Sequence, residues 1–152
     1  MALGLAGLRR HPVLLAAPAW PELVERLEGF FEVEQAEGAL ATAALLQKMQ
    51  GKSALLAAQP AGIDAALLAQ LPHLRAVCRI GAGSNGLDLE ACTAAGVLVT
   101  DTPALGEEEP AQRRMAMIAA DNLIATFGFG RIGGQPPNLL NTELRCTLGC
   151  CL

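Results

Sequence analysis

The sequence predicts an α/β domain with a parallel sheet and helices on both of its faces. Five short apolar or alternating segments are separated by helical segments, and this alternation is typical of parallel sheets with right-handed crossovers. Hydrophobic residues make up 52% of the 152 residues, and aromatic residues only 3%. The apolar residues are mainly Ala, Leu, Val and Ile, which suit helices packed on a buried sheet. A chain of this length normally folds as one domain.

The first 35 residues contain two predicted strands and one predicted helix. Val13–Ala17 is a short apolar run that ends at Pro18, and it predicts the first strand. A helix is expected over Pro21–Gly29, because proline is tolerated in the first turn of a helix. Phe31–Gln35 alternates apolar and acidic residues. A period of two predicts an edge strand with one solvated face.

The next segments predict a central strand between two helices. A helix is expected over Thr42–Gln50, and Gly51 ends it. Ser53–Ala58 is continuously apolar, which favours a strand in the middle of the sheet. A third helix is expected over Ile63–Gln70, before Pro72.

A glycine loop follows the fourth predicted strand, Ala76–Ile80, and contains Gly81, Gly83 and Gly86. A short helix, Leu87–Ala95, and a fifth strand, 97–100, come next. In an open α/β sheet, ligands bind at the carboxyl ends of the strands, where this loop lies. The loop is therefore the candidate site.

The remaining residues change in character. Leu105–Ala111 is acidic and contains proline, so we expect a linker. A long helix with an apolar stripe is predicted over 112–127. Phe129–Asn141 is rich in Gly, Pro and Asn and predicts an extended surface segment. Thr142–Leu152 is expected to be a disordered tail.

Charge and apolar patterning argue against two classes of partner. The net charge is −4 and the basic residues form no stripe, so nucleic acid is not an expected partner. No apolar run approaches the roughly 18 residues that a membrane span needs. Arg9 and Arg10 follow the apolar N-terminal residues, which is the reverse of a signal peptide. We therefore expect a cytoplasmic protein that contacts no membrane.

The five cysteines match neither a disulfide framework nor a metal site. Cys78 falls in a predicted strand and Cys92 in a predicted helix. Cys146, Cys150 and Cys151 have the spacing C-x3-C-C, and neither a histidine nor a second cysteine pair completes a zinc site. We expect reactive thiols in a tail and assign no metal ligand.

Three interpretations of the glycine loop stay open on spacing alone. Residues 81–86 satisfy G-x-G-x-x-G, and Asp101 lies 20 residues beyond Gly81, which superficially matches a dinucleotide fingerprint. The short following helix and the position on the fourth strand argue against it. The backbone N–H groups could instead bind a carboxylate. The loop could also be only a tight turn, with Asn85 or Asp88 capping the helix.

The stretch 71–103 resembles the substrate-domain signature of the D-isomer-specific 2-hydroxyacid dehydrogenases, in particular the glyoxylate/hydroxypyruvate reductase group. The motifs that carry the resemblance are Gly81-Ala82-Gly83, Leu87-Asp88, the helix Ala91–Gly96 and Thr100-Asp101-Thr102-Pro103. The resemblance covers roughly residues 12–104. Residues 113–141 are similar to the C-terminal end of the family, where a helix returns to pack on the substrate domain.

The resemblance implies a flavodoxin-like, three-layer fold with strand order 2-1-3-4-5, closed by the C-terminal helix 112–127. One domain, residues 1–141, would be built from 12–104 and that helix. The linker 105–111 would stand in place of the NAD(P)-binding domain of the family.

The catalytic Arg, acidic residue and His of the family, and its NAD or NADP site, fall in the segment that is missing here. We therefore assign no catalytic, cofactor or metal residue. The remaining substrate contacts would be the backbone N–H groups of Ala82 and Gly83, in the turn that begins at Gly81. His11 and His73 are expected to be ordinary surface histidines, and Arg79 to have no catalytic role. The acidic residues 107–109 are expected to be a solvated linker.

We therefore expect a truncated or engineered substrate-binding domain that is inactive alone and binds small 2-oxo or 2-hydroxy acids weakly. Two hydrogen bonds to a charged group contribute roughly 3–6 kcal/mol, against an association cost of about 4 kcal/mol or more. One alternative is a reductase part that needs a separate nucleotide domain, and another is a regulatory or interaction module. Self-association is expected, through an uncovered interdomain face or exchange of the C-terminal helix.

Overall fold

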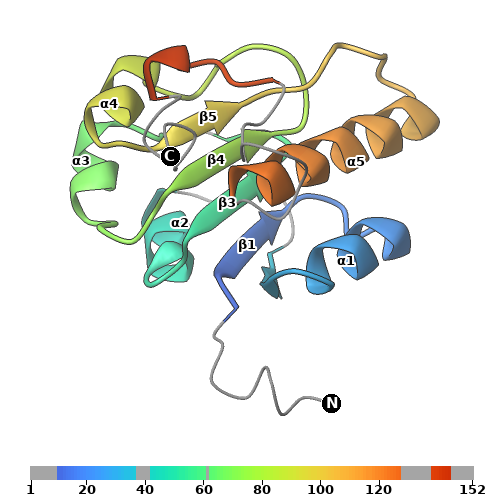
Figure 1. Ribbon diagram of the computed structural model, residues 1–152, viewed down its shortest axis with the longest axis horizontal. Helices are drawn as coiled ribbons and strands as arrows, with labels where there is room; N and C mark the ends of the chain where they lie inside the picture. Colours follow the sequence, from blue (N-terminus) through green and yellow to red (C-terminus); the bar gives the residue numbers. More distant parts are fainter. Residues whose placement is uncertain (1–9, 37–41, 61, 128–137, 145–152) are drawn as a thin grey trace.

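Five parallel strands form one sheet in the order β2-β1-β3-β4-β5 (Figure 1). The computed structural model describes residues 10–36, 42–60, 62–127 and 138–144. The strands are β1 (Pro12–Ala16), β2 (Glu32–Gln35), β3 (Ala54–Ala57), β4 (Ala76–Arg79) and β5 (Leu98–Thr100). The predicted α/β class, five parallel strands and strand order are confirmed.

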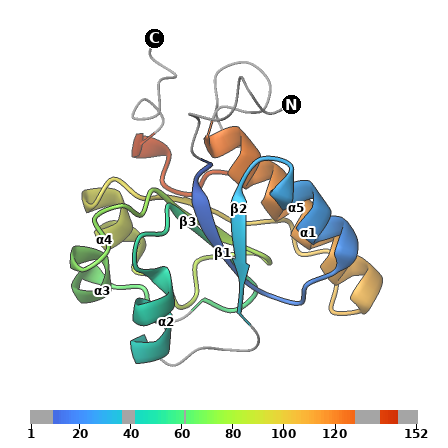
Figure 2. The same cartoon turned by 90° about the horizontal axis from the view of Figure 1, so that it is seen from below.

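Helices cover both faces of the sheet (Figure 2). One face is covered by α1 (Pro21–Glu28) and α5 (Glu109–Thr126), which also contact each other. The other face is covered by α2 (Thr42–Met49), α3 (Ala65–Ala69) and α4 (Leu89–Ala94). None of the helices in the described ranges combines the length and the apolar character that a bilayer crossing requires.

The core has two halves because successive side chains of a strand point to opposite faces. Val13 and Leu15 of β1 join the cluster beneath α1 and α5, and Leu14 joins the cluster beneath α2, α3 and α4. All three side chains are fully buried. Burying a side chain of this size contributes about 1.5–3 kcal/mol, so the central strands anchor both layers. β2 pairs only with β1, in agreement with its alternating sequence.

The long C-terminal helix begins earlier than the sequence predicts. It starts at Glu109 rather than 112, and Pro110 lies in its first turn. Proline is compatible with that position because the first N–H groups of a helix have no intrahelical partner. The connection from β5 to α5 is therefore 101–108, and not the linker expected over 105–111.

Residues 138–144 lie along the open edge of β5. The Leu140 N–H donates to the Val99 carbonyl at 2.8 Å, and Thr100 and Leu139 form an antiparallel bridge. Asn141 is 1% exposed, whereas the sequence predicted a surface segment up to that residue. Thr142–Leu144 form a 3₁₀ turn with Leu144 buried, which differs from the expected disordered tail. The rest of that tail lies outside the described residues.

Candidate functional site

The glycine loop, residues 81–86, lies at the carboxyl edge of the sheet, directly after β4. Gly81, Gly83 and Gly86 have φ angles of +126°, +93° and +82°. L side chains rarely adopt such angles, so the loop requires glycine at these three positions. Ala82 and Gly83 are exposed. The turn therefore exposes the backbone of Gly83, which has no side chain to cover it.

Hydrogen bonds from neighbouring segments fix the shape of this loop. The Gly81 N–H donates to Thr102 Oγ1 at 2.9 Å, and the Thr102 N–H donates to the Gly81 carbonyl at 3.0 Å. Arg79 Nη1 donates to the Asn85 carbonyl at 2.9 Å. Arg79 thus braces the loop through its guanidinium group.

The Gly83 N–H already has a carboxylate partner within the chain. It donates to Asp101 Oδ2 at 2.9 Å. The two residues meet because β4 and β5 are neighbours, with Cys78 opposite Thr100, so that their carboxyl ends lie side by side. Within the described ranges, the Ala82 N–H donates to no acceptor. The carboxylate at Gly83 is the main feature that sequence reasoning missed.

Asp101 is held from two directions. Its N–H donates to the Asn138 carbonyl at 3.2 Å, and its carbonyl accepts a hydrogen bond from Asn122 Nδ2 at 2.9 Å. Asn122 lies on α5 and is fully buried, and its Oδ1 has no partner among the described residues. The backbone of Asp101 is therefore fixed by α5 and by the edge segment 138–144.

Asp88, one of the two predicted caps, does cap the helix after the loop. Its Oδ1 accepts a hydrogen bond from the Ala91 N–H at 3.0 Å, at the start of α4. Asn85 contributes its carbonyl to Arg79 instead. A pyrophosphate bound as in a dinucleotide fold would meet the carboxylates of both Asp88 and Asp101. Like charges at short range disfavour that ligand.

Both histidines lie at the opposite edge of the sheet. His11 immediately precedes β1 and His73 precedes β4, whereas the glycine loop follows β4. The His11 ring contacts Phe127, with ring centroids 4.4 Å apart. Burial, and then the charge of Arg75, lower the pKa of His11 below 6.5. Neither imidazole can act as an acid or base at the loop. Within the described ranges, no three His, Cys, Asp or Glu side chains gather in a metal-binding group.

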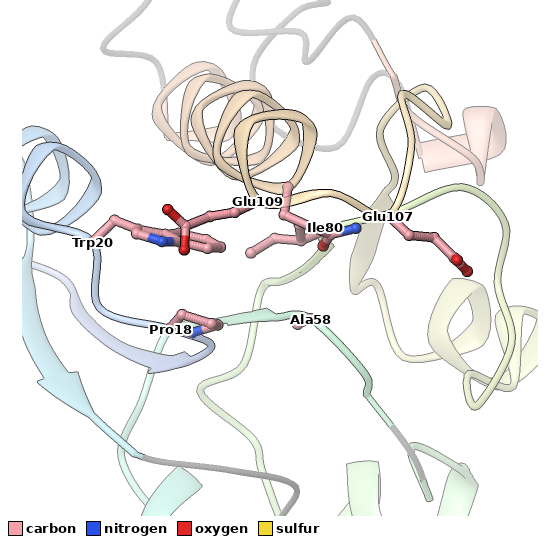
Figure 3. Close-up of a pocket in the computed structure, with 7 residues that line it drawn as sticks. Pro18, Trp20, Ala58, Ile80, Glu107 and Glu109 are labelled. Atoms are coloured by element: carbon pink, nitrogen blue, oxygen red, sulfur yellow. The ribbon is translucent and has the colours of Figure 1, made fainter.

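A pocket of about 300 Å³ lies next to the loop, over the carboxyl ends of β1, β3 and β4 (Figure 3). The strand order reverses between β1 and β3, which is where open α/β sheets bind ligands. The pocket is lined by Pro18, Trp20, Ala58, Ile80, Glu107, Glu109 and Gln112. The sequence predicted only a solvated linker at 107–109.

The charge of this pocket is unfavourable for an acid ligand. In Figure 3 the Glu109 carboxylate lies beside the Trp20 indole, and the Glu107 carboxylate points away from it. Arg113 Nη1 lies 3.9 Å from Glu109 Oε1, whereas Arg113 Nε lies 3.1 Å from Glu22 Oε1. Since exposed ion pairs of this kind are weak, the pocket keeps a negative charge.

Known proteins are similar to this chain in sequence and in fold. Residues 13–141 match the family described as "D-isomer specific 2-hydroxyacid dehydrogenase, catalytic domain". The chain is 29% identical to the glyoxylate reductase of Aeropyrum pernix, over 91% of this chain and 45% of that protein. It is 31% identical to glyoxylate/hydroxypyruvate reductase B of Shigella flexneri, over 70% of this chain and 34% of that protein.

Solved structures agree with these relatives. The TT0316 protein from Thermus thermophilus superimposes with a TM-score of 0.57 and 27% identity, over 79% of this chain and 42% of that one. The chain thus spans less than half the length of the curated relatives it matches. The match to the family extends across the sheet, the glycine loop, α5 and the edge segment. The chain belongs to the D-isomer specific 2-hydroxyacid dehydrogenase family.

Proposed function

We propose that the chain is the substrate-binding part of a 2-hydroxyacid dehydrogenase and binds the carboxylate of small 2-oxo or 2-hydroxy acids at the glycine loop. One observation carries the proposal: the Gly83 N–H already donates to a carboxylate oxygen at 2.9 Å. The loop geometry is therefore suited to this chemical group. Two relatives are named for reduction of glyoxylate or hydroxypyruvate, both 2-oxo acids, and this sets the ligand class.

We further propose that this chain does not reduce these acids alone. Reduction of a carbonyl needs a hydride carrier and a proton donor near the carbon. The described residues place both histidines at the far edge of the sheet. Asp88 and Asp101, near the loop, are engaged by backbone N–H groups. The site can hold an acid, but these groups do not form an acid–base pair for its reduction.

Binding should be weak. The two N–H groups of Ala82 and Gly83 contribute roughly 3–6 kcal/mol, and association costs about 4 kcal/mol or more. The net gain is therefore at most about 2 kcal/mol, well short of the roughly 4.1 kcal/mol that corresponds to 1 mM, so the dissociation constant should be tens of millimolar or higher.

The test is an NMR titration of ¹⁵N-labelled protein with glyoxylate, using two matched glycine variants. Gly83→Ala and Gly51→Ala both place a Cβ at a positive φ, +93° and +77°, with no atom within 4 Å of it. Each should lose about 1–2 kcal/mol of stability. Only Gly83→Ala should weaken binding, because Gly51 follows α2 outside the loop.

Glycolaldehyde, which lacks the carboxylate, is the control ligand. Glyoxylate at tens of millimolar should shift the amide signals of Ala82 and Gly83, and glycolaldehyde should not. An unshifted pair of signals, or equal loss of binding in the two glycine variants, would contradict the proposal.

A second candidate is that the chain completes an active enzyme with a separate nucleotide-binding domain. The length of the relatives favours it, because this chain accounts for only 45% and 34% of the two reductases. The test adds a nucleotide-binding domain from such a relative, with NADPH and glyoxylate. Oxidation of NADPH that requires both parts would support it, and no oxidation at any ratio would exclude it for that pair.

A further inference from the structure

We propose that Asp101 is an internal competitor, whose carboxylate occupies the anion position at Gly83 and must be displaced by an acid ligand. This inference rests on the proposed function, because it concerns the same loop. It identifies a residue of this chain that sets the affinity for carboxylates.

The competition follows from one hydrogen bond. The Gly83 N–H donates to Asp101 Oδ2 at 2.9 Å. An N–H carries one proton, so it cannot make two good hydrogen bonds to two carboxylates at once. Gly83 is exposed and a Cβ built on it meets nothing within 4 Å. The Gly83–Asp101 hydrogen bond is itself exposed, so solvent and small ligands can approach the position that Asp101 occupies.

The competitor is well positioned before any ligand arrives. The Asp101 N–H donates to the Asn138 carbonyl, and the Asp101 carbonyl accepts a hydrogen bond from the buried Asn122 side chain. A group held in its bound position loses little conformational freedom when it binds. The internal carboxylate therefore has an advantage over a free acid, which must also lose translational freedom.

Charge adds to the effect. The charged side chains on the loop, on the strand ends beside it and in the first turn of α4 are Arg79, which braces the loop, and the carboxylates of Asp88, Glu90 and Asp101. Asp88 is engaged at the Ala91 N–H, and Glu90 is exposed in the first turn of α4. An incoming acid thus meets more negative than positive charge. Asp101 is the member of this set that also occupies the Gly83 donor.

The experiment measures glyoxylate affinity by ¹⁵N NMR in the wild type, Asp101→Ala, Asp101→Asn and Glu90→Gln. Asp101→Ala frees the donor and removes the charge, so the dissociation constant should fall at least 10-fold. Asp101→Asn keeps an acceptor oxygen but not the charge, so its dissociation constant should lie between those of the wild type and Asp101→Ala. Glu90→Gln removes a nearby charge alone and should change the constant less than twofold.

The outcomes separate this inference from the proposed function. If the wild type binds and both Asp101 variants bind equally or more weakly, Asp101 is a brace, and the inference fails while the proposed function stands. If only the Asp101 variants bind, the inference holds and the native chain is not a carboxylate binder. If no protein binds, both ideas fail. Dispersed ¹⁵N spectra identify folded variants, and Asp101→Asn keeps the test valid if Asp101→Ala does not fold.

Discussion

Replacing Asn141 by Ala should destabilise the protein by about 2–4 kcal/mol. The Asn141 side chain donates to the Val97 carbonyl at 2.7 Å and accepts from the Val99 N–H at 2.9 Å, and the residue is 1% exposed. Each hydrogen bond contributes about 0.5–1.5 kcal/mol net, and a buried group left unpaired costs about 1–3 kcal/mol. The variant loses both bonds and leaves two backbone groups of the β5 edge without this partner.

Urea unfolding at 25 °C, followed by circular dichroism, measures this loss. The slope of the free energy against urea should be unchanged, because the surface exposed on unfolding is nearly the same. The midpoint should therefore fall in proportion to the lost free energy.

Thr142→Ala is the matched control, because Thr142 is exposed in the same segment. Thr142→Ala should change the free energy of unfolding by no more than about 0.5 kcal/mol. A loss below about 0.5 kcal/mol for Asn141→Ala would refute the reasoning, since the edge segment would then add nothing to the stability of the sheet.

Four further predictions concern other parts of the molecule. Asp88→Ala removes the cap of α4 and should cost about 1 kcal/mol in the same unfolding assay. The pKa of His11 is lower in the folded protein, so the His11 imidazole binds a proton more readily in the unfolded chain. The free energy of unfolding should therefore fall as the pH drops through 6.5 towards the folded pKa. His11→Gln should flatten the dependence of stability on pH in this range. Burial raises the pKa of the Cys78 thiol to about 12 and of the Cys92 thiol to about 11, so iodoacetamide at pH 8 should modify both slowly until urea is added, as measured by peptide mass spectrometry. Self-association, through the face around the 39% exposed Leu105 or by exchange of α5, predicts a dimer in light scattering at high concentration, and a monodisperse monomer would contradict it.

The elements of the fold could be predicted because their signals are local. Ala54–Ala57 is apolar throughout and lies in the middle of the sheet, and Glu32–Gln35 alternates and lies at its edge. Gly81, Gly83 and Gly86 adopt the positive φ angles that a tight glycine turn implies. Hydrophobic periodicity and glycine placement involve only residues that are close in the sequence. They can therefore be recognised without knowing which distant segments come into contact.

The missed features depend on contacts between distant segments. Asp101 reaches Gly83 across a strand pair, and Asn141 pairs with Val97 and Val99, more than 40 residues away. No periodicity marks such contacts, because a polar side chain in a Gly, Pro and Asn-rich stretch is usually a loop residue. The start of α5 at Glu109 is equally hard to predict, because Pro110 suits both a linker and a first helical turn.

A crystal structure of the protein grown with a high concentration of glyoxylate would show whether an acid displaces Asp101 from Gly83. We expect the glyoxylate carboxylate within hydrogen-bond distance of the Gly83 and Ala82 nitrogens, with the Asp101 side chain turned away. Glyoxylate seated in the pocket beside Trp20 and Glu109, with the Asp101 contact intact at full ligand occupancy, would contradict it.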